Sequence, residues 1–109
     1  MIKLEDSYKH KGQRKKLAEL IQSKGIEDEG IIAAITKVPR HFFFENALEQ
    51  FAYQDKAFPI GKGQTISQPY TVAYQTQLLN VNKGEKILEI GTGSGYQTCI
   101  LYELGVDVY

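Results

Sequence analysis

The sequence has few of the residues that build disulfides and metal sites. Its 109 residues include one cysteine, Cys99, and two histidines, His10 and His41. One cysteine cannot form an intramolecular disulfide, and paired-cysteine zinc patterns are excluded. Neither histidine is expected to have a histidine, cysteine or carboxylate at metal-binding spacing beside it, so we expect packed or surface roles and no metal. The lone cysteine suits a reducing compartment, and we expect a cytoplasmic protein.

Excess charge and long apolar runs are also missing. Thirteen Lys and Arg residues balance thirteen Asp and Glu residues, so overall charge predicts neither a nucleic-acid partner nor an anionic membrane surface. The basic stretch 9–16 is typical of a solvated helix start. No segment is apolar enough to span a bilayer, and residues 1–7 do not resemble a signal peptide. We expect an unexported chain without membrane contacts.

Helical periodicity dominates the first part of the chain. A first helix is predicted over about residues 11–24, with Gly25 just beyond its end. Asp28 is a predicted N-cap of a second helix, which Pro39 ends. Pro69 suits the first position of a third helix that runs to about residue 80. The residues of this third helix that we expect to be buried are Val72, Leu78 and Leu79.

An aromatic segment and a glycine-containing loop lie between the second and third helices. The aromatic residues of segment 40–53 are more typical of core packing than of ligand stacking, and a short helix is expected over 45–50. Glycines and flanking prolines in segment 59–69 predict a loop or a short edge strand. We therefore expect residues 1–80 to form a helical and loop region.

The remaining residues, 81–109, have the pattern of a parallel sheet. Segment 86–90 is a short apolar run typical of a buried parallel strand, and 96–104 is compatible with a helix that Gly105 ends. A second β-branched run begins at residue 106. The order strand, glycine loop, helix, strand predicts a βαβ unit of the α/β class. Two parallel strands alone leave open edges, so we expect a fragment.

The glycine loop itself predicts a cofactor site. Gly91, Gly93 and Gly95 follow the first strand, whereas a dinucleotide fingerprint would place its third glycine at position 96, which is Tyr96. Glu89 would repel a pyrophosphate but not a cationic methionine-derived ligand, which favours S-adenosylmethionine. The P-loop and serine-elbow motifs are absent. A glycine turn without a ligand is the alternative.

Four stretches together resemble the protein-L-isoaspartate O-methyltransferase family over about residues 13–109. Segment 63–69, Gly-Gln-Thr-Ile-Ser-Gln-Pro, is the most specific of them, because many class I methyltransferases share the glycine loop. The four stretches are Val38-Pro-Arg, Ala52-Tyr-Gln-Asp, Pro59-Ile-Gly-Lys-Gly-Gln-Thr-Ile-Ser-Gln-Pro and Leu88-Glu-Ile-Gly-Thr-Gly-Ser-Gly-Tyr-Gln. The resemblance implies a truncated class I, Rossmann-like methyltransferase, with N-terminal helices before the first βαβ unit.

The resemblance also implies a function and a set of site residues. It implies protein repair by methyl transfer from S-adenosyl-L-methionine to the α-carboxylate of L-isoaspartyl residues in damaged proteins. Ser67 is the implied catalytic residue, without a histidine base, and its position before Pro69 alone would instead favour a helix cap. The implied cofactor-binding residues are Thr65, Ile66, Glu89, Gly91, Thr92, Gly93, Ser94 and Gly95.

Three alternatives remain open at this point: a class I methyltransferase with another acceptor, a non-catalytic isoaspartyl-binding module and a dinucleotide oxidoreductase, which the glycine spacing disfavours. One departure from the family pattern is Gln75, where many relatives have methionine. The family's ribose- and adenine-contacting residues would lie beyond Tyr109, so this chain alone is expected to be inactive. The sequence predicts no oligomeric state.

Overall fold

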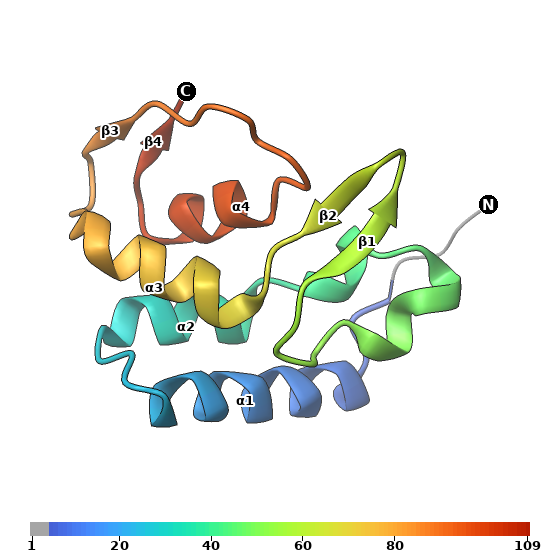
Figure 1. Cartoon of the computed structure of the whole chain (residues 1–109). Helices are drawn as coiled ribbons and strands as arrows, with labels where there is room; N and C mark the ends of the chain where they lie inside the picture. Colours follow the sequence, from blue (N-terminus) through green and yellow to red (C-terminus); the bar gives the residue numbers. More distant parts are fainter. Residues whose placement is uncertain (1–4) are drawn as a thin grey trace.

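The computed structural model describes residues 5–109 and leaves part of the N-terminal stretch used above outside the described residues. Helices stack in layers, with a hairpin at one side and a βαβ unit above them (Figure 1). The elements are α1 (Tyr8–Ser23), α2 (Glu29–Lys37), the 3-10 helices η1 (Arg40–Phe43) and η2 (Asn46–Phe51), β1 (Phe58–Gly61), β2 (Gln64–Ile66), α3 (Pro69–Leu79), β3 (Lys86–Ile87), α4 (Tyr96–Glu103) and β4 (Asp107–Val108).

Helix α1 begins three residues earlier than the sequence predicts, because a capping box forms at its start. The Ser7 hydroxyl accepts the His10 backbone N–H at 3.2 Å, and the Ser7 backbone N–H donates to Nδ1 of His10 at 3.2 Å. Glu or Gln usually fills the third position of such a box. Because His10 occupies it here, the sequence did not indicate this helix start. Gly25, with φ +109°, follows the helix end as predicted.

The second predicted helix is confirmed with its cap. Oδ1 of Asp28 accepts the backbone N–H groups of Gly30 at 2.9 Å and Ile31 at 3.3 Å. These bonds satisfy two donors that the first turn of a helix leaves without partners. Helix α2 ends at Lys37, two residues before Pro39.

Segment 59–69 forms short strands and then a helix, as expected. Strands β1 and β2 pair antiparallel with an irregularity between Pro59 and Gly61, and α3 begins with Pro69 in its first turn. The prediction that Leu78 and Leu79 are buried is wrong, because both side chains are exposed. Helix α3 instead turns a face with three- and four-residue spacing to the core, which buries Pro69, Val72, Ala73 and Thr76.

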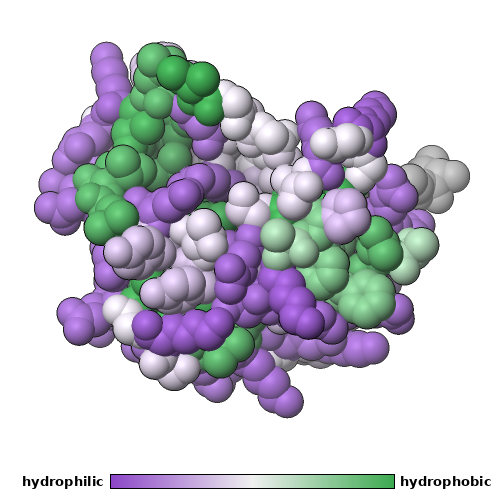
Figure 2. Space-filling model, in the orientation of Figure 1, coloured by the Kyte–Doolittle hydropathy of each residue, from purple (hydrophilic) through white to green (hydrophobic). Residues whose placement is uncertain are grey.

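The predicted βαβ unit is present, but its first strand is not buried. Strands β3 and β4 are parallel, and Asp107 N–H donates to the Glu85 carbonyl at 2.9 Å. Strand β3 is only two residues long, and Leu88 and Ile90 are 73% and 88% exposed. Within residues 5–109 only β4 pairs with β3, and these two side chains stay exposed because no layer packs over them. Apolar surface gathers over this end of the molecule (Figure 2).

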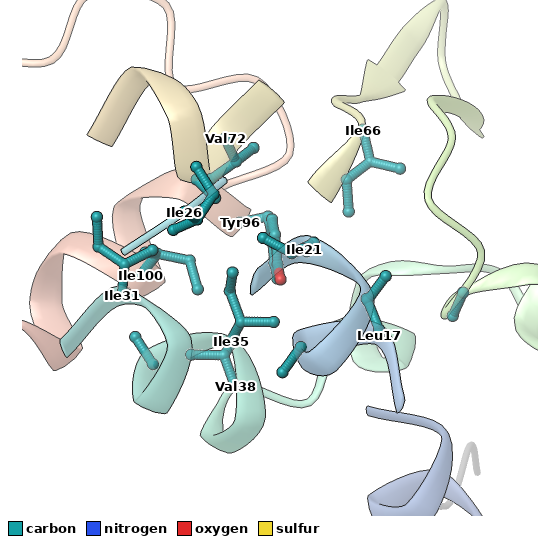
Figure 3. Packing of buried hydrophobic residues seen from close by; sticks show 14 of the residues in the cluster. Leu17, Ile21, Ile26, Ile31, Ile35, Val38, Ile66, Val72, Tyr96 and Ile100 are labelled. Carbon is teal, nitrogen blue, oxygen red and sulfur yellow. The ribbon is translucent and has the colours of Figure 1, made fainter. Parts of the chain in front are cut away.

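A single core joins the helices to the βαβ unit. Leu17 of α1, Ile35 of α2, Val72 of α3 and Ile100 of α4 belong to one buried cluster (Figure 3). The aromatic segment packs beside it, and the Phe44 and Phe58 ring centroids are 5.8 Å apart. Phe43, Phe44 and Tyr53 of this segment thus pack in or against the core, as predicted. In the described part of the chain, every helix is too short or too polar to cross a bilayer.

Candidate functional site

A cavity of about 220 Å³ lies between the segment that joins β2 to α3 and the glycine loop that joins β3 to α4. In Figure 1 the loop after β3 extends across α4 toward β2. Two segments more than twenty residues apart in the sequence thus meet at one site. The lining residues are Thr65, Ser67, Val72, Glu89, Gly91, Thr92, Gly93, Ser94, Tyr96 and Gln97.

The glycine loop leaves its backbone open to the cavity. Gly91 and Gly93 have φ values of +73° and +59°, a left-handed conformation that side chains other than glycine rarely adopt. The Ser94 hydroxyl accepts the Tyr96 backbone N–H at 3.1 Å and so stabilises the start of α4. Gly95 is the N-cap of α4 but does not line the cavity. The loop therefore offers unblocked peptide groups to a ligand.

Glu89 gives the cavity its negative charge. It is the one lining residue that is charged at neutral pH, and its carboxylate Oε1 accepts a hydrogen bond from the Thr98 hydroxyl on α4. Its backbone N–H donates to the Tyr109 carbonyl at 2.8 Å, beside β4. The sheet and α4 thus both hold Glu89, and the site suits a cationic ligand better than a pyrophosphate.

The alternation of side chains along β2 divides the predicted residues of segment 65–67. Thr65 and Ser67 line the cavity, whereas the Ile66 side chain is fully buried in the core. An Ile66 contact to a cofactor would therefore involve its backbone. Ser67 does not cap α3, because Gln68 holds the N-cap position without a side-chain hydrogen bond. Within residues 5–109 the Ser67 hydroxyl has no hydrogen-bond partner, which leaves it free for a ligand.

The sequence did not identify three lining residues: Val72, Tyr96 and Gln97. Tyr96 is buried, its ring lies 5.6 Å edge-on from that of Phe43, and burial raises the pKa of its hydroxyl to about 12. Nε2 of Gln97 donates to the Thr76 hydroxyl at 3.3 Å, which fixes α4 against α3. Tyr96 and Gln97 lie in the resembling stretch after the glycines, but their side chains carry no chemistry that predicts a site.

One expectation about the histidines is wrong. The rings of His10 and His41 stack with centroids 3.7 Å apart, and Asp6 lies close enough for one ligand atom from each residue to fall within 4.8 Å of the others. Asp6 also precedes His10 by four residues, a helical spacing that the sequence analysis overlooked. His41 comes from η1, 31 positions after His10, so only the fold brings the rings together.

Existing partners occupy this cluster. Nε2 of His10 lies 2.7 Å from a Glu49 carboxylate oxygen, and Nδ1 of His41 lies 2.7 Å from the Tyr53 hydroxyl. Each carboxylate oxygen of Asp6 accepts a hydrogen bond from Arg14, and burial lowers the pKa of His41. The predicted role as packed polar residues therefore describes these side chains, and the absence of a metal stays a prediction.

Cys99 lies in α4, as predicted, and is half-buried. Burial, together with the negative charges of Glu103 and Glu89, raises the pKa of its thiol. A raised pKa disfavours the reactive thiolate, so this cysteine has a packing role.

Comparison with known proteins agrees with this geometry. Residues 12–107 match the family described as protein-L-isoaspartate(D-aspartate) O-methyltransferase. The chain is 62% identical over 106 residues to the protein-L-isoaspartate O-methyltransferase of Cytophaga hutchinsonii and 60% identical over 106 residues to that of Flavobacterium johnsoniae. Each alignment covers 97% of this chain but 48% and 50% of the relative. The chain thus spans about half the length of these curated relatives.

Solved structures show the same relationship. A protein-L-isoaspartate O-methyltransferase superposes with a TM-score of 0.75 at 27% identity, over 87% of this chain and 32% of that one. A Plasmodium falciparum structure, described as a beta-aspartate methyltransferase in complex with S-adenosyl-L-homocysteine, superposes with a TM-score of 0.69 at 28% identity, over 87% and 46%. With its cavity between the serine segment and the glycine loop, this chain belongs to the protein-L-isoaspartate(D-aspartate) O-methyltransferase family.

Proposed function

We propose that this chain supplies the cofactor loop and the serine segment of a cytoplasmic protein repair methyltransferase. The reaction is transfer of a methyl group from S-adenosyl-L-methionine to the α-carboxylate of L-isoaspartyl residues in damaged proteins. One observation carries the proposal: Ser67 and the glycine loop line the same cavity. Family membership and the half-length match to enzymes of that name support it.

The residues of the cavity fit the cofactor. Gly91 and Gly93 leave the backbone uncovered, and Glu89 attracts the positive charge of a methionine-derived sulfonium. The cofactor supplies an activated methyl group when bound. We propose that Thr65, the Ile66 backbone, Glu89 and residues 91–95 hold it, with residues 1–80 as the N-terminal helical and substrate-loop region and 81–109 as the start of the cofactor domain.

The protein's contribution to the chemistry is positioning. A carboxyl group with a pKa near ~4 is already ionised at neutral pH, so no general base is needed. The Ser67 hydroxyl, which has no partner within residues 5–109, donates a hydrogen bond that orients the substrate carboxylate. Correct alignment of the reacting groups lowers a barrier by up to roughly 7–11 kcal/mol. The backbone nitrogen of the following residue then attacks the methyl ester and expels methanol, which closes a succinimide, and water reopens this ring in part to normal aspartate.

The test is transfer of labelled methyl from S-adenosylmethionine to an isoaspartyl peptide and to its aspartyl twin. It uses a protein of the relatives' length that carries this chain. We expect methylation of the isoaspartyl peptide alone, abolished by Gly93→Val and reduced roughly 10- to 100-fold by Ser67→Ala, which removes a hydrogen bond to a charged group.

The controls and alternatives follow from the same assay. Gly84→Val, at another positive-φ glycine that lies outside the cavity, should retain transfer whenever the protein folds. Equal methylation of both peptides, or none by a folded protein that binds the cofactor, would overturn the isoaspartyl assignment. An isoaspartyl peptide that binds to a protein without cofactor affinity would instead indicate a non-catalytic reader.

A further inference from the structure

Arg40 is a fully buried arginine whose hydrogen bonds converge on the backbone near Ser67. The side chain is 0% exposed. Its Nε donates to the Ala52 carbonyl at 2.9 Å, and its Nη2 donates to the Lys56 carbonyl at 3.2 Å and to the Ser67 carbonyl at 3.0 Å. The planar guanidinium carries five N–H donors in a rigid fork, and two of its nitrogens here reach three carbonyls.

The same guanidinium also contacts the helix that follows the glycine loop. Its central carbon lies 4.7 Å from the ring centroid of Tyr96 and 5.6 Å from that of Phe44. Tyr96 is the first residue of α4 and lines the cavity. A cation over an aromatic face is attracted by the ring's electron density, and more strongly when both are buried. Arg40 therefore connects the serine segment with the start of α4.

Asp55 holds the other end of the serine segment. Its side chain is 4% exposed, and Oδ1 accepts the backbone N–H of Tyr70 at 2.8 Å in the first turn of α3. Its second oxygen forms an ion pair with Lys24, the C-cap residue of α1. A carboxylate at a helix start satisfies an unpaired N–H and interacts favourably with the helix dipole. Hydrogen bonds from outside the segment thus fix it at Ser67 and at Tyr70.

We propose that Arg40 and Asp55 are positioning residues that hold the Ser67 segment, residues 67–70, in the geometry needed for methyl transfer. The inference rests on the proposed function. It concerns residues that do not line the cavity and act through the backbone on which the Ser67 hydroxyl is carried. The Ser67 hydroxyl has no hydrogen bond of its own within residues 5–109, so its position depends on this backbone.

The expected signature is a loss of turnover without loss of cofactor affinity. In the relatives-length protein, Arg40→Lys keeps the charge but lacks the fork of donors. A misplacement of about 1 Å costs up to roughly 100-fold in rate, so we expect kcat for the isoaspartyl peptide to fall by up to that factor. The Kd for S-adenosyl-L-homocysteine should stay close to that of the parent. Asp55→Ala should act in the same direction by a smaller factor.

Arg14→Lys is the matched control. Arg14 is also buried, and it bonds Asp6, the Tyr53 hydroxyl and the Thr36 carbonyl rather than the serine segment. The Arg14→Lys substitution should reduce the stability of the protein but leave kcat nearly unchanged below the variant's unfolding temperature. If Arg40→Lys lowers kcat no more than Arg14→Lys does, or if cofactor affinity falls in parallel with kcat, the proposal is wrong.

Amide hydrogen exchange provides a readout that needs no activity. In Arg40→Lys and Asp55→Ala, the amides of residues 67, 68, 70 and 71 should exchange faster, since Pro69 has no amide hydrogen, while those in the middle of α1 keep the parent's protection. Uniform protection in both variants would contradict the proposal. If Arg40→Lys does not fold, Asp55→Ala decides alone by the same two measurements. A parent protein that fails to methylate the isoaspartyl peptide would overturn the proposed function. The exchange result would still test whether Arg40 and Asp55 hold the Ser67 segment.

Discussion

The hydroxyl of Thr98 donates a hydrogen bond to the carboxylate of Glu89. This bond joins α4 to the chain just after β3, where the glycine loop begins. Glu89 is the charged group of the cavity, and this bond fixes the direction in which it faces. The charge and its orientation can therefore be tested separately.

Replacement of Glu89 by Gln keeps the size of the side chain and an oxygen for Thr98 but removes the charge. We expect S-adenosylmethionine to bind roughly tenfold or more weakly, because hydrogen bonds to charged groups contribute about 1.5–3 kcal/mol. Isothermal titration calorimetry measures the change. Thr98→Val should have a smaller effect of the same sign, and Glu85→Gln, at an exposed carboxylate that bonds Asn82, should have none. Unchanged affinity in Glu89→Gln would contradict the proposed role of the charge.

Gly93 and Gly84 separate backbone strain from site chemistry. Both have positive φ, +59° and +88°, and an added Cβ meets no atom closer than 3.9 Å in either case. Gly93→Ala and Gly84→Ala should each cost about 1–2 kcal/mol of stability, from the left-handed conformation alone. Only Gly93→Ala should weaken S-adenosyl-L-homocysteine binding. Equal binding losses in both variants, measured by calorimetry beside urea unfolding, would mean that strain alone explains the effect.

Ser67 and Ser94 should differ in stability. The Ser67 hydroxyl has no partner in the described chain, so Ser67→Ala should change the free energy of unfolding by no more than about 0.5 kcal/mol. The Ser94 hydroxyl accepts the Tyr96 N–H, and Ser94→Ala should cost about 1 kcal/mol. Urea denaturation compares the two. A large loss in Ser67→Ala would show a structural role for its hydroxyl.

Stability should fall at mildly acidic pH because of His41. Burial, and the adjacent His10, lower the pKa of His41 below its usual 6.5, so the folded state holds it neutral while the unfolded state binds a proton. Its contribution is complete above about pH 6.5 and decreases as pH falls from there toward the lower folded pKa. Asp6, whose pKa the hydrogen bond from Arg14 lowers below 3.8, contributes a separate loss at still lower pH.

The control for this pH dependence is His41→Gln, followed by urea denaturation from pH 7.5 to pH 4.5. The variant should be less stable at pH 7.5 and should lose the slope below pH 6.5. A parent protein whose stability is constant over this range would contradict the prediction. Persistence of the slope in His41→Gln would also contradict the prediction.

Leu88 and Ile90 should promote self-association of the isolated chain. They are 73% and 88% exposed beside the open edge of β3, where Figure 2 shows apolar surface. Leu88→Gln with Ile90→Thr should therefore shift the 109-residue chain toward monomer in analytical ultracentrifugation. Tyr8→Gln, at an exposed residue on α1, is the control and should have little effect. A wholly monomeric parent would contradict the prediction.

Local signals in the sequence predicted most of the fold. Asp28, Gly25 and Pro69 each act on neighbouring backbone, so the ends of α1, α2 and α3 were close to the predicted positions. The glycine spacing and Glu89 are also local signals, and they predicted the side of the cavity that the glycine loop forms. The family resemblance, rather than periodicity, predicted that Ser67 belongs to that site.

What the sequence missed depends on contacts between distant residues. The hydrogen bond from Arg40 to Ser67 spans 27 positions, and the stacking of His10 on His41 is likewise long-range. The apolar run that includes Leu88 and Ile90 predicts a covered strand, but its burial requires another layer packed on that face of the sheet, and both side chains are exposed within residues 5–109. Periodicity indicates which face is apolar but not what lies against it.

The shared core has one more consequence. Tyr96 and Ile100 of α4 are buried with Leu17 of α1 and Ile35 of α2. The helix that follows the glycine loop therefore shares its hydrophobic core with the first two helices. Small domains with one core unfold in a single cooperative step. Heating should therefore remove the ligand site and the helical layers together, at one transition temperature, instead of weakening the site gradually while the helices persist.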